Sequence, residues 1–287
     1  MAKASGPECF AAIAMLTPCL AFAQSPALHE GFVDAPGAKI FYKDSAGSGA
    51  PVIFLHAFTG SAEVWEHQIP AFTRAGYRFI AYDRRGFGRT TADANGPAST
   101  AADDLLALVD HLKIRKFHLV GTAAGGFVAI DFALSYPERL RSFTLLCSTG
   151  GIQDQDYVDA TRRMRPEGFD KLPRSFLELS PSYRFANPEG LARWSEFERT
   201  NRAPEAVRGP AQPSKNRVTL ALLERIKTPT LVIAGDADLY APPALMRRIA
   251  DHIPGAQFTV IPDAGHSVWW ELPDQFNRTV LAFISKH

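Results

Sequence analysis

The chain has 287 residues, 46% of them hydrophobic, and its formal net charge at pH 7 is +1. This length fits one large domain or a domain with a substantial insertion, and the apolar fraction can fill a core. A charge so close to zero gives no electrostatic basis for binding nucleic acid or an anionic membrane surface. We therefore expect a small-molecule substrate rather than either of these partners, and the oligomeric state stays open.

The first residues have the pattern of a secretory signal peptide. Lys3 opens a short basic segment, residues 9–23 are mostly apolar, and Ala21-Phe22-Ala23 has the small-x-small form of a cleavage site. The apolar run is too short to span a bilayer. We predict a signal peptide over residues 1–23, a periplasmic or secreted mature protein and no membrane span after cleavage. A disordered or membrane-anchoring tail is the alternative.

Strand and helix patterns alternate along most of the remaining chain, and the apolar run Pro51–Leu55 is typical of a strand buried on both faces. The predicted strands are 31–35, 38–43, 51–55, 77–82, 117–120, 140–147, 229–234 and 257–261. The predicted helices are 63–75, a helix after the N-cap Thr100, 127–136, 242–253 and 273–286. This alternation predicts an α/β fold with a mostly parallel, doubly wound sheet.

The alternation pauses between Gly150 and about Lys227, where no strong strand pattern occurs. A segment of this length is too long for a plain loop. We predict a helical cap over residues 150–227, inserted into a core formed by residues 24–149 and 228–287. The cap contains seven aromatic residues, which suggest an apolar pocket wall and hence an apolar substrate. They are Tyr157, Phe169, Phe176, Tyr183, Phe185, Trp194 and Phe197.

The segment Gly121-Thr122-Ala123-Ala124-Gly125 follows an apolar strand and precedes a helix. Its glycine spacing is that of the G-x-S-x-G nucleophile elbow, in which a sharp turn presents the middle residue. Here the middle residue is Ala123, so the position of the nucleophile lacks a hydroxyl.

Four further motifs occur in a consistent order around this elbow. They are His56-Ala57-Phe58-Thr59-Gly60, Asp83-Arg84-Arg85-Gly86-Phe87-Gly88, Gly235-Asp236-Ala237-Asp238 and Gly265-His266. With them, the chain from about Val33 to its end resembles the α/β-hydrolase superfamily. The order elbow, acid, base is that of the superfamily.

The resemblance implies a role for each matching position. His266 would be the general base, and Asp238, three residues after Gly235, would orient it, with Asp236 as the competing carboxylate. The backbone N–H groups of Phe58 and Ala124 would form the oxyanion hole. Ala57 stands where the superfamily usually has glycine, which would disturb the turn if a positive φ were needed.

Other polar residues have competing interpretations. Arg84, Arg85 and Arg89 could bind an anionic substrate, but structural pairing around a glycine-rich loop is the simpler expectation. Ser148 or Thr149 could supply a polar group at the same edge of the sheet. The sequence has no metal-ligand cluster and no phosphate or dinucleotide motif, so we expect no metal and no cofactor.

The missing serine leaves several accounts of function. Loss of an established triad serine costs on the order of a million-fold in turnover, while about a thousand-fold over water can persist. The favoured hypothesis is an enzyme acting on a small ester- or lactone-like molecule, in which the pair His266–Asp238 activates water. The alternatives are a non-catalytic small-molecule binding protein, a cofactor-free lyase or oxygenase using the same pair, and an inactivated serine hydrolase.

Overall fold

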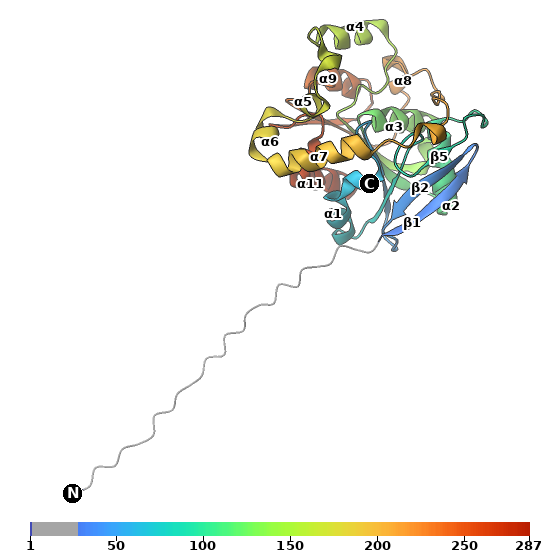
Figure 1. Cartoon of the computed structure of the whole chain (residues 1–287), viewed down its shortest axis with the longest axis horizontal. Helices are drawn as coiled ribbons and strands as arrows, with labels where there is room; N and C mark the ends of the chain where they lie inside the picture. Colours follow the sequence, from blue (N-terminus) through green and yellow to red (C-terminus); the bar gives the residue numbers. More distant parts are fainter. Residues whose placement is uncertain (2–27) are drawn as a thin grey trace.

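The computed structural model describes Met1 and residues 28–287. Apart from Met1, the predicted signal peptide over residues 1–23 lies outside the described residues (Figure 1).

The core is built on one mixed sheet of order β1-β2-β4-β3-β6-β7-β8-β9, with β5 paired to β2. β1, β2 and β5 pair in antiparallel fashion, and all neighbours from β4 to β9 are parallel. The predicted mostly parallel sheet is therefore present. The strands are β1 (His29–Ala35), β2 (Ala38–Asp44), β3 (Pro51–Leu55), β4 (Arg78–Tyr82), β5 (Thr91–Ala92), β6 (Phe117–Thr122), β7 (Leu140–Leu146), β8 (Thr230–Gly235) and β9 (Gln257–Ile261).

Helices cover both faces of this sheet, as a doubly wound fold requires (Figure 1). α2, α3 and α9 bury their apolar residues against one face, and α1, α10 and α11 bury theirs against the other. The central strands β6 and β8 are buried along their whole length, which explains their continuous apolar runs. The core helices are η1 (Ala62–Trp65), α1 (Gln68–Arg74), α2 (Ala101–His111), α3 (Ala124–Ser135), η2 (Pro137–Arg139), α9 (Pro243–Asp251), α10 (Val268–Glu271) and α11 (Pro273–Ile284).

Two helix predictions differ from the structure by more than two residues at one end or in continuity. The single helix predicted over 63–75 is split into η1 and α1. A continuous helix would need an N–H at Pro70 to bond the preceding turn, and proline has none, so Pro70 sits in the first turn of a new helix. The helix predicted from Phe127 begins at Ala124, directly after the elbow residue.

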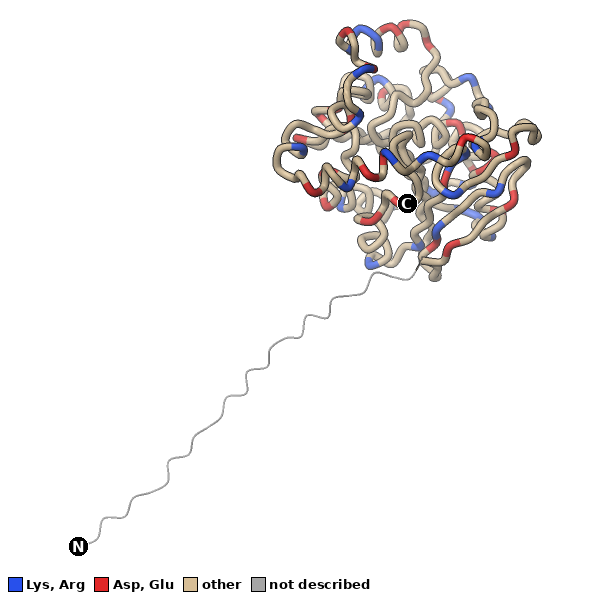
Figure 2. The backbone as a smooth tube through the Cα atoms, viewed as in Figure 1, with Lys and Arg blue, Asp and Glu red and all other residues tan. Residues whose placement is uncertain are grey.

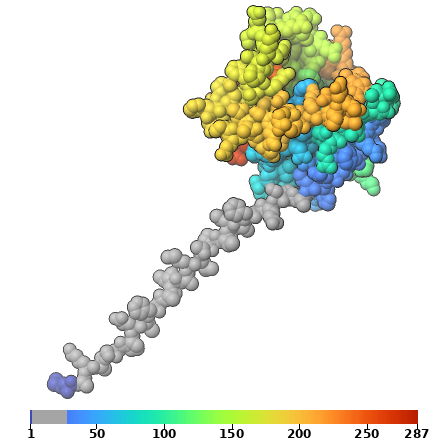
Figure 3. Space-filling model, in the orientation of Figure 1, coloured from blue at the N-terminus to red at the C-terminus, as the bar shows by residue number. Residues whose placement is uncertain are grey.

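Residues between β7 and β8 form a group of short helices above the core (Figure 1, Figure 3). Figure 2 shows acidic and basic residues interspersed along this region and the rest of the fold, in keeping with the small net charge. Among the described residues, no helix is both long enough and apolar enough to cross a membrane. The helices of this region are α4 (Gln155–Arg163), η3 (Phe169–Lys171), α5 (Arg174–Glu178), α6 (Pro181–Ala186), α7 (Pro188–Thr200), η4 (Glu205–Val207) and α8 (Leu220–Leu223).

Candidate active site

The turn between β6 and α3 has the geometry of a nucleophile elbow. Ala123 lies at φ 50° and ψ −119°, a region that non-glycine residues rarely occupy. A Cβ on Gly125 would stand 2.4 Å from the carbonyl oxygen of Leu55, and one on Gly121 would stand 2.7 Å from the Ala129 Cβ. The glycines are therefore needed for the close approach of helix and strand, as the spacing predicts.

Ala123 lies at the bottom of a pocket of about 280 Å³ formed by loops at the carboxyl ends of the strands and by the cap. Its methyl group is almost covered, with 7% of the residue exposed. The pocket is lined by Phe58, Thr59, Ala123, Ala124, Phe127, Ser148, Thr149, Arg165, Arg174, Glu178, Tyr240 and His266.

The cap aromatics do not line this pocket, but Phe169 and Phe176 line a separate cavity that Asp238 also borders. Tyr157 and Trp194 are buried in the two hydrophobic cores, and Phe185 is exposed on the surface. Tyr157 and Trp194 thus anchor their helices to the core, whereas Phe185 does not. The aromatic residues at the pocket, Phe58, Phe127 and Tyr240, come from the core segments instead.

The structure brings His266 and Asp238 together. His266 follows β9 and Asp238 follows β8, and the His266 Nδ1 lies 2.8 Å and 3.0 Å from the two carboxylate oxygens of Asp238. The backbone N–H groups of Tyr240 and Ala241 also donate to Asp238 Oδ1, at 2.7 Å and 3.0 Å. Asp236 is exposed, so it is Asp238 that can orient the imidazole and leave its Nε2 for the pocket.

The charge state of His266 follows from its buried surroundings. Burial alone favours the neutral imidazole, but the carboxylates of Asp238, Glu178 and Glu271 outweigh it and raise the pKa of His266 to about 9. The pKa of Asp238 is lowered, because its hydrogen bond and attraction to His266 overcome the effect of burial, which alone would raise it. His266 is therefore mainly protonated at neutral pH.

Two backbone N–H groups beside Ala123 are available to an oxyanion. Phe58 and Ala124 both line the pocket, and within residues 28–287 neither N–H donates to a protein acceptor. The side chain of Asn201, from the cap, donates to the Phe58 carbonyl oxygen at 2.8 Å and holds that loop. Ala57 has no positive φ, so alanine in place of glycine is tolerated there.

The hydroxyl groups of Ser148 and Thr122 are poor substitutes for a serine nucleophile. Ser148 lines the pocket, but its hydroxyl donates to the Ala123 carbonyl oxygen at 2.6 Å and accepts from the Gly150 N–H at 3.1 Å. The Thr122 hydroxyl is buried without a partner in the described chain and does not line the pocket. Thr149 does line it. No group of three or more metal-ligating side chains occurs within the described residues.

Sequence reasoning missed several charged residues of the site. Glu178 is buried and accepts from the Ser267 hydroxyl at 3.2 Å, and burial raises its pKa. Arg165 and Arg174 reach the pocket from the cap, and Arg174 donates to the Tyr240 hydroxyl at 2.7 Å. No motif marks these residues, because the cap meets the core only in the folded chain.

Of the three arginines in the loop that begins at Asp83, two form ion pairs with acidic side chains and, within the described chain, one does not. Arg85 forms a buried ion pair with Asp104, and Arg89 pairs with Glu30, as expected of structural residues. Arg84 has no ion pair within residues 28–287, and its Nε and Nη2 are buried without hydrogen-bond partners. Structural pairing therefore explains two of the three.

Comparison with known proteins agrees with this architecture. A model of the alpha/beta hydrolase fold family matches residues 50–273. The chain is 30% identical over 265 residues to a 2-hydroxy-6-oxononadienedioate/2-hydroxy-6-oxononatrienedioate hydrolase of Comamonas testosteroni, a match covering 84% of this chain and 90% of that protein. It is also 30% identical over 269 residues to the non-heme chloroperoxidase CPO-A1 of Kitasatospora aureofaciens, covering 87% and 97%.

Solved structures show the same fold. A thermophilic esterase from Thermogutta terrifontis has a TM-score of 0.74 and 29% identity, covering 90% of this chain and 98% of that one. Est816, described as an N-acyl homoserine lactone degrading enzyme, has a TM-score of 0.71 and 29% identity, covering 88% and 100%. Relatives named as hydrolases and esterases support the expectation of a hydrolase. The chain belongs to the α/β-hydrolase family.

Proposed function

We propose that the protein hydrolyses a small ester- or lactone-like molecule by activating water, without a covalent intermediate. The observation that carries this proposal is the intact pair His266–Asp238, at 2.8 Å, in the same pocket as the N–H groups of Phe58 and Ala124. Relatives named as an esterase and a lactone-degrading enzyme support the choice of substrate class.

The proposed reaction uses groups already in place. Neutral His266 accepts a proton from water at its Nε2 while the water oxygen attacks the carbonyl carbon of the substrate. The N–H groups of Phe58 and Ala124 stabilise the negative charge that forms on the carbonyl oxygen. His266 then returns its proton to the leaving oxygen, which gives an acid and an alcohol. Asp238 holds the imidazole with Nε2 towards the pocket and stabilises its charged form.

The absence of a hydroxyl at Ala123 is what makes this route non-covalent. The methyl group cannot attack a carbonyl, and it leaves room beside His266 for the attacking water. Without the covalent step the rate advantage is smaller, so a substrate with a good leaving group suits this site best.

The direct test is a screen of the purified protein against small esters and lactones, followed by the variants His266→Ala and Asp238→Asn. Both variants should abolish turnover of any substrate found. The control is His111→Ala, because His111 ends α2 and does not line the pocket. Unchanged turnover in His266→Ala would refute the proposed mechanism.

A second candidate function is binding of a small anion without turnover. It is favoured by Arg165 and Arg174, two cations that line the pocket, where Glu178 is the one acid among the described lining residues. Tight retention of a ligand with no turnover in the same screen would support the binding protein and contradict the hydrolase.

We also propose, from the signal-peptide pattern, that the mature protein is periplasmic or secreted.

A further inference from the structure

A second cavity of about 350 Å³ adjoins the candidate active site. It lies between the loop after β4, the first turns of α3 and the segment of the cap that leads back to the core. Ala124 and Phe127 line both cavities, so a single ligand could extend from one to the other.

Three arginines of this cavity have no acidic partner. Arg84, Arg202 and Arg208 line it, and none of them forms an ion pair within residues 28–287. Arg85, which also lines the cavity, is neutralised by Asp104, with Nη2 to Oδ1 at 2.7 Å. Because Asp131 is the one acidic side chain among the described lining residues, and the Arg85–Asp104 pair is neutral, the cavity carries a net positive charge.

Arg84 is poorly satisfied for a buried guanidinium. Its Nε and Nη2 have no hydrogen-bond partner, although both are shielded from solvent. A buried donor left without an acceptor is costly, and more so when the group is charged. Arg84 also lines the cavity, where an oxyanion would offset the charge of its guanidinium group.

The arginines are held close to one another despite their like charge. The guanidinium groups of Arg84 and Arg202 both stack on the ring of Phe87, at 4.8 Å and 4.3 Å from its centroid. Burial, with Arg202 nearby, lowers the pKa of Arg84 to about 10, and burial, with Arg208 and Arg174, lowers the pKa of Arg202. Guanidinium groups stay charged at neutral pH, and the repulsion between Arg84 and Arg202 would be relieved by an anion.

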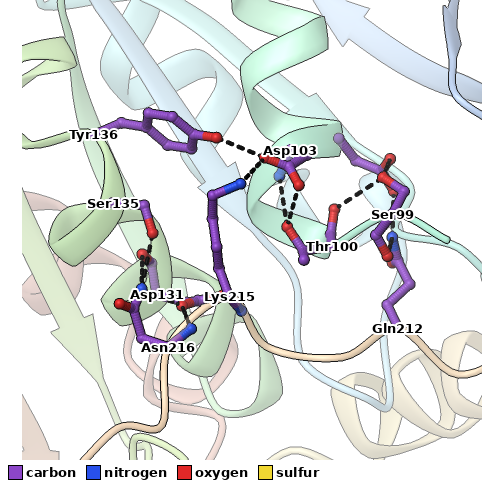
Figure 4. Close-up of polar contacts among 10 residues, drawn as sticks. Ser99, Thr100, Asp103, Asp131, Ser135, Tyr136, Gln212, Lys215 and Asn216 are labelled. Carbon is purple, nitrogen blue, oxygen red and sulfur yellow. Dashed lines mark hydrogen bonds and ion pairs between the residues drawn. The ribbon is translucent and has the colours of Figure 1, made fainter.

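The acid among the lining residues, Asp131, is engaged elsewhere. Its oxygens accept from the backbone N–H groups of Lys215 and Asn216, at 2.7 Å and 2.9 Å, and from the Asn216 side chain at 2.8 Å (Figure 4). These hydrogen bonds attach the segment around Lys215 and Asn216, which leads from the cap back to the core, to α3.

A second contact fastens the same wall. The side chain of Gln212 donates to Asp104 Oδ2 at 2.8 Å, so the segment is attached to α2 as well. One wall of the cavity is thus held by hydrogen bonds to both α2 and α3.

We propose that this cavity binds the carboxylate or phosphate group of a small organic anion, and that the rest of that molecule reaches the pocket at Ala123. Arg84 and Arg202 supply the positive charge that attracts such a group, and Arg208 lies exposed at the rim. The placement of the reactive part rests on the proposed function, whereas the anion site itself does not.

Binding can be measured by isothermal titration of the full mature protein with three probes: glutarate, inorganic phosphate and uncharged glutaramide. We expect glutarate or phosphate to bind, glutaramide not to bind, and added salt to weaken the interaction. The two anions separate a carboxylate ligand from a phosphate ligand. Arg84→Gln and Arg202→Gln should each weaken binding by about tenfold or more, the effect of losing a charge-assisted hydrogen bond.

The matched control is Arg89→Gln, which removes an arginine of the same loop that pairs with Glu30 and does not line the cavity. It should leave the affinity unchanged. Arg208→Gln, at an exposed residue, provides a further variant in case Arg84→Gln fails to fold. Absence of binding by both anions, or equal weakening by Arg89→Gln and the cavity variants, would overturn the proposal.

The same titration with His266→Ala separates this inference from the proposed function. His266 does not line the anion cavity, so anion affinity should be retained even though turnover is lost. If no ester or lactone is hydrolysed at all, binding of glutarate or phosphate still decides whether the anion site exists.

Discussion

His266 is proposed to act as a general base, yet it is mainly protonated at neutral pH. A base must be neutral to accept a proton, but the carboxylates around His266 hold it protonated at neutral pH, with a pKa of about 9. At pH 7 about one molecule in a hundred then has the active form. The same carboxylates that position the imidazole therefore set the pH range in which it works.

The first prediction concerns this pH range. Turnover that depends on neutral His266 should rise as pH increases from 7 and level off above about 9. The measurement is kcat/KM against pH for the best substrate of the screen, with the imidazole of His266 titrated by NMR. A rate that is already level between pH 6 and 8 would contradict the role of His266 as base.

The contribution of His266 to the free energy of unfolding should fall as pH rises, whereas turnover should increase. Because the pKa of His266 is raised above its ordinary value of 6.5, its protonated form is favoured by folding. The resulting contribution to the free energy of unfolding is fully present below about pH 6.5 and is lost as pH rises through about 9. Chemical denaturation at several pH values, compared with His266→Ala, measures this difference.

Ala123 is the residue whose replacement is most informative. In Ala123→Ser the hydroxyl would stand on the same turn, at φ 50°, beside His266 and the two free N–H groups. We expect esterase turnover to increase by several orders of magnitude, since a triad serine is worth on the order of a million-fold. Ester hydrolysis of both proteins provides the measurement.

Covalent labelling tests independently whether position 123 carries a nucleophile. A serine-directed fluorophosphonate should leave the natural protein unlabelled and label Ala123→Ser. The double variant Ala123→Ser with His266→Ala is the control, and it should lose both the gain in rate and most of the labelling. Stoichiometric labelling of the natural protein would reveal another nucleophile.

At the scale of elements, the elbow depends on glycines that permit contact between α3 and the central strands. We predict that Gly125→Ala destabilises the fold by about 1–3 kcal/mol or more, because its Cβ would overlap the Leu55 carbonyl oxygen. Gly255→Ala is the control, since no atom lies within 4 Å of its Cβ and it tests positive φ alone. Thermal or urea denaturation measures both, and an unchanged stability of Gly125→Ala would contradict the packing argument.

At the scale of the whole molecule, the site exists because parallel strands end at the same edge of the sheet. The loops after β3, β6, β8 and β9 supply Phe58, Ala123, Asp238 and His266. The cap closes the site from above and adds arginines that belong to no core motif. Asp238 and His266 thus meet at 2.8 Å, and Phe58 and Ala123, from distant parts of the chain, line the same pocket as His266.

The last prediction concerns export of the whole chain. Expressed in full in a secreting bacterial host, the protein should be recovered outside the cytoplasm with Gln24 as its first residue. Ala23→Leu should block this cleavage, and Phe22→Leu, at the position that tolerates large residues, should not. Cell fractionation and intact-mass measurement decide, and a cytoplasmic, uncleaved protein would contradict the signal peptide.

Local chemistry made much of the fold predictable. Continuous apolar runs mark strands buried on both faces, Thr100 caps α2 by accepting from the Asp103 N–H at 3.1 Å, and the glycine spacing marks the elbow. These properties depend on residues close in sequence, so a pattern can reveal them. The fold class and the family membership follow from several such patterns in a fixed order.

The tertiary structure decided which distant groups meet. The choice between Asp238 and Asp236, the burial of Glu178, and the cluster of Arg84, Arg202 and Arg208 all depend on loops and cap helices packing together. Electrostatic interactions depend on distance and burial rather than on position in the chain, and no local pattern encodes either. The sequence therefore determined the scaffold and the missing hydroxyl of Ala123, and the packing determined the charge and shape of the site around it.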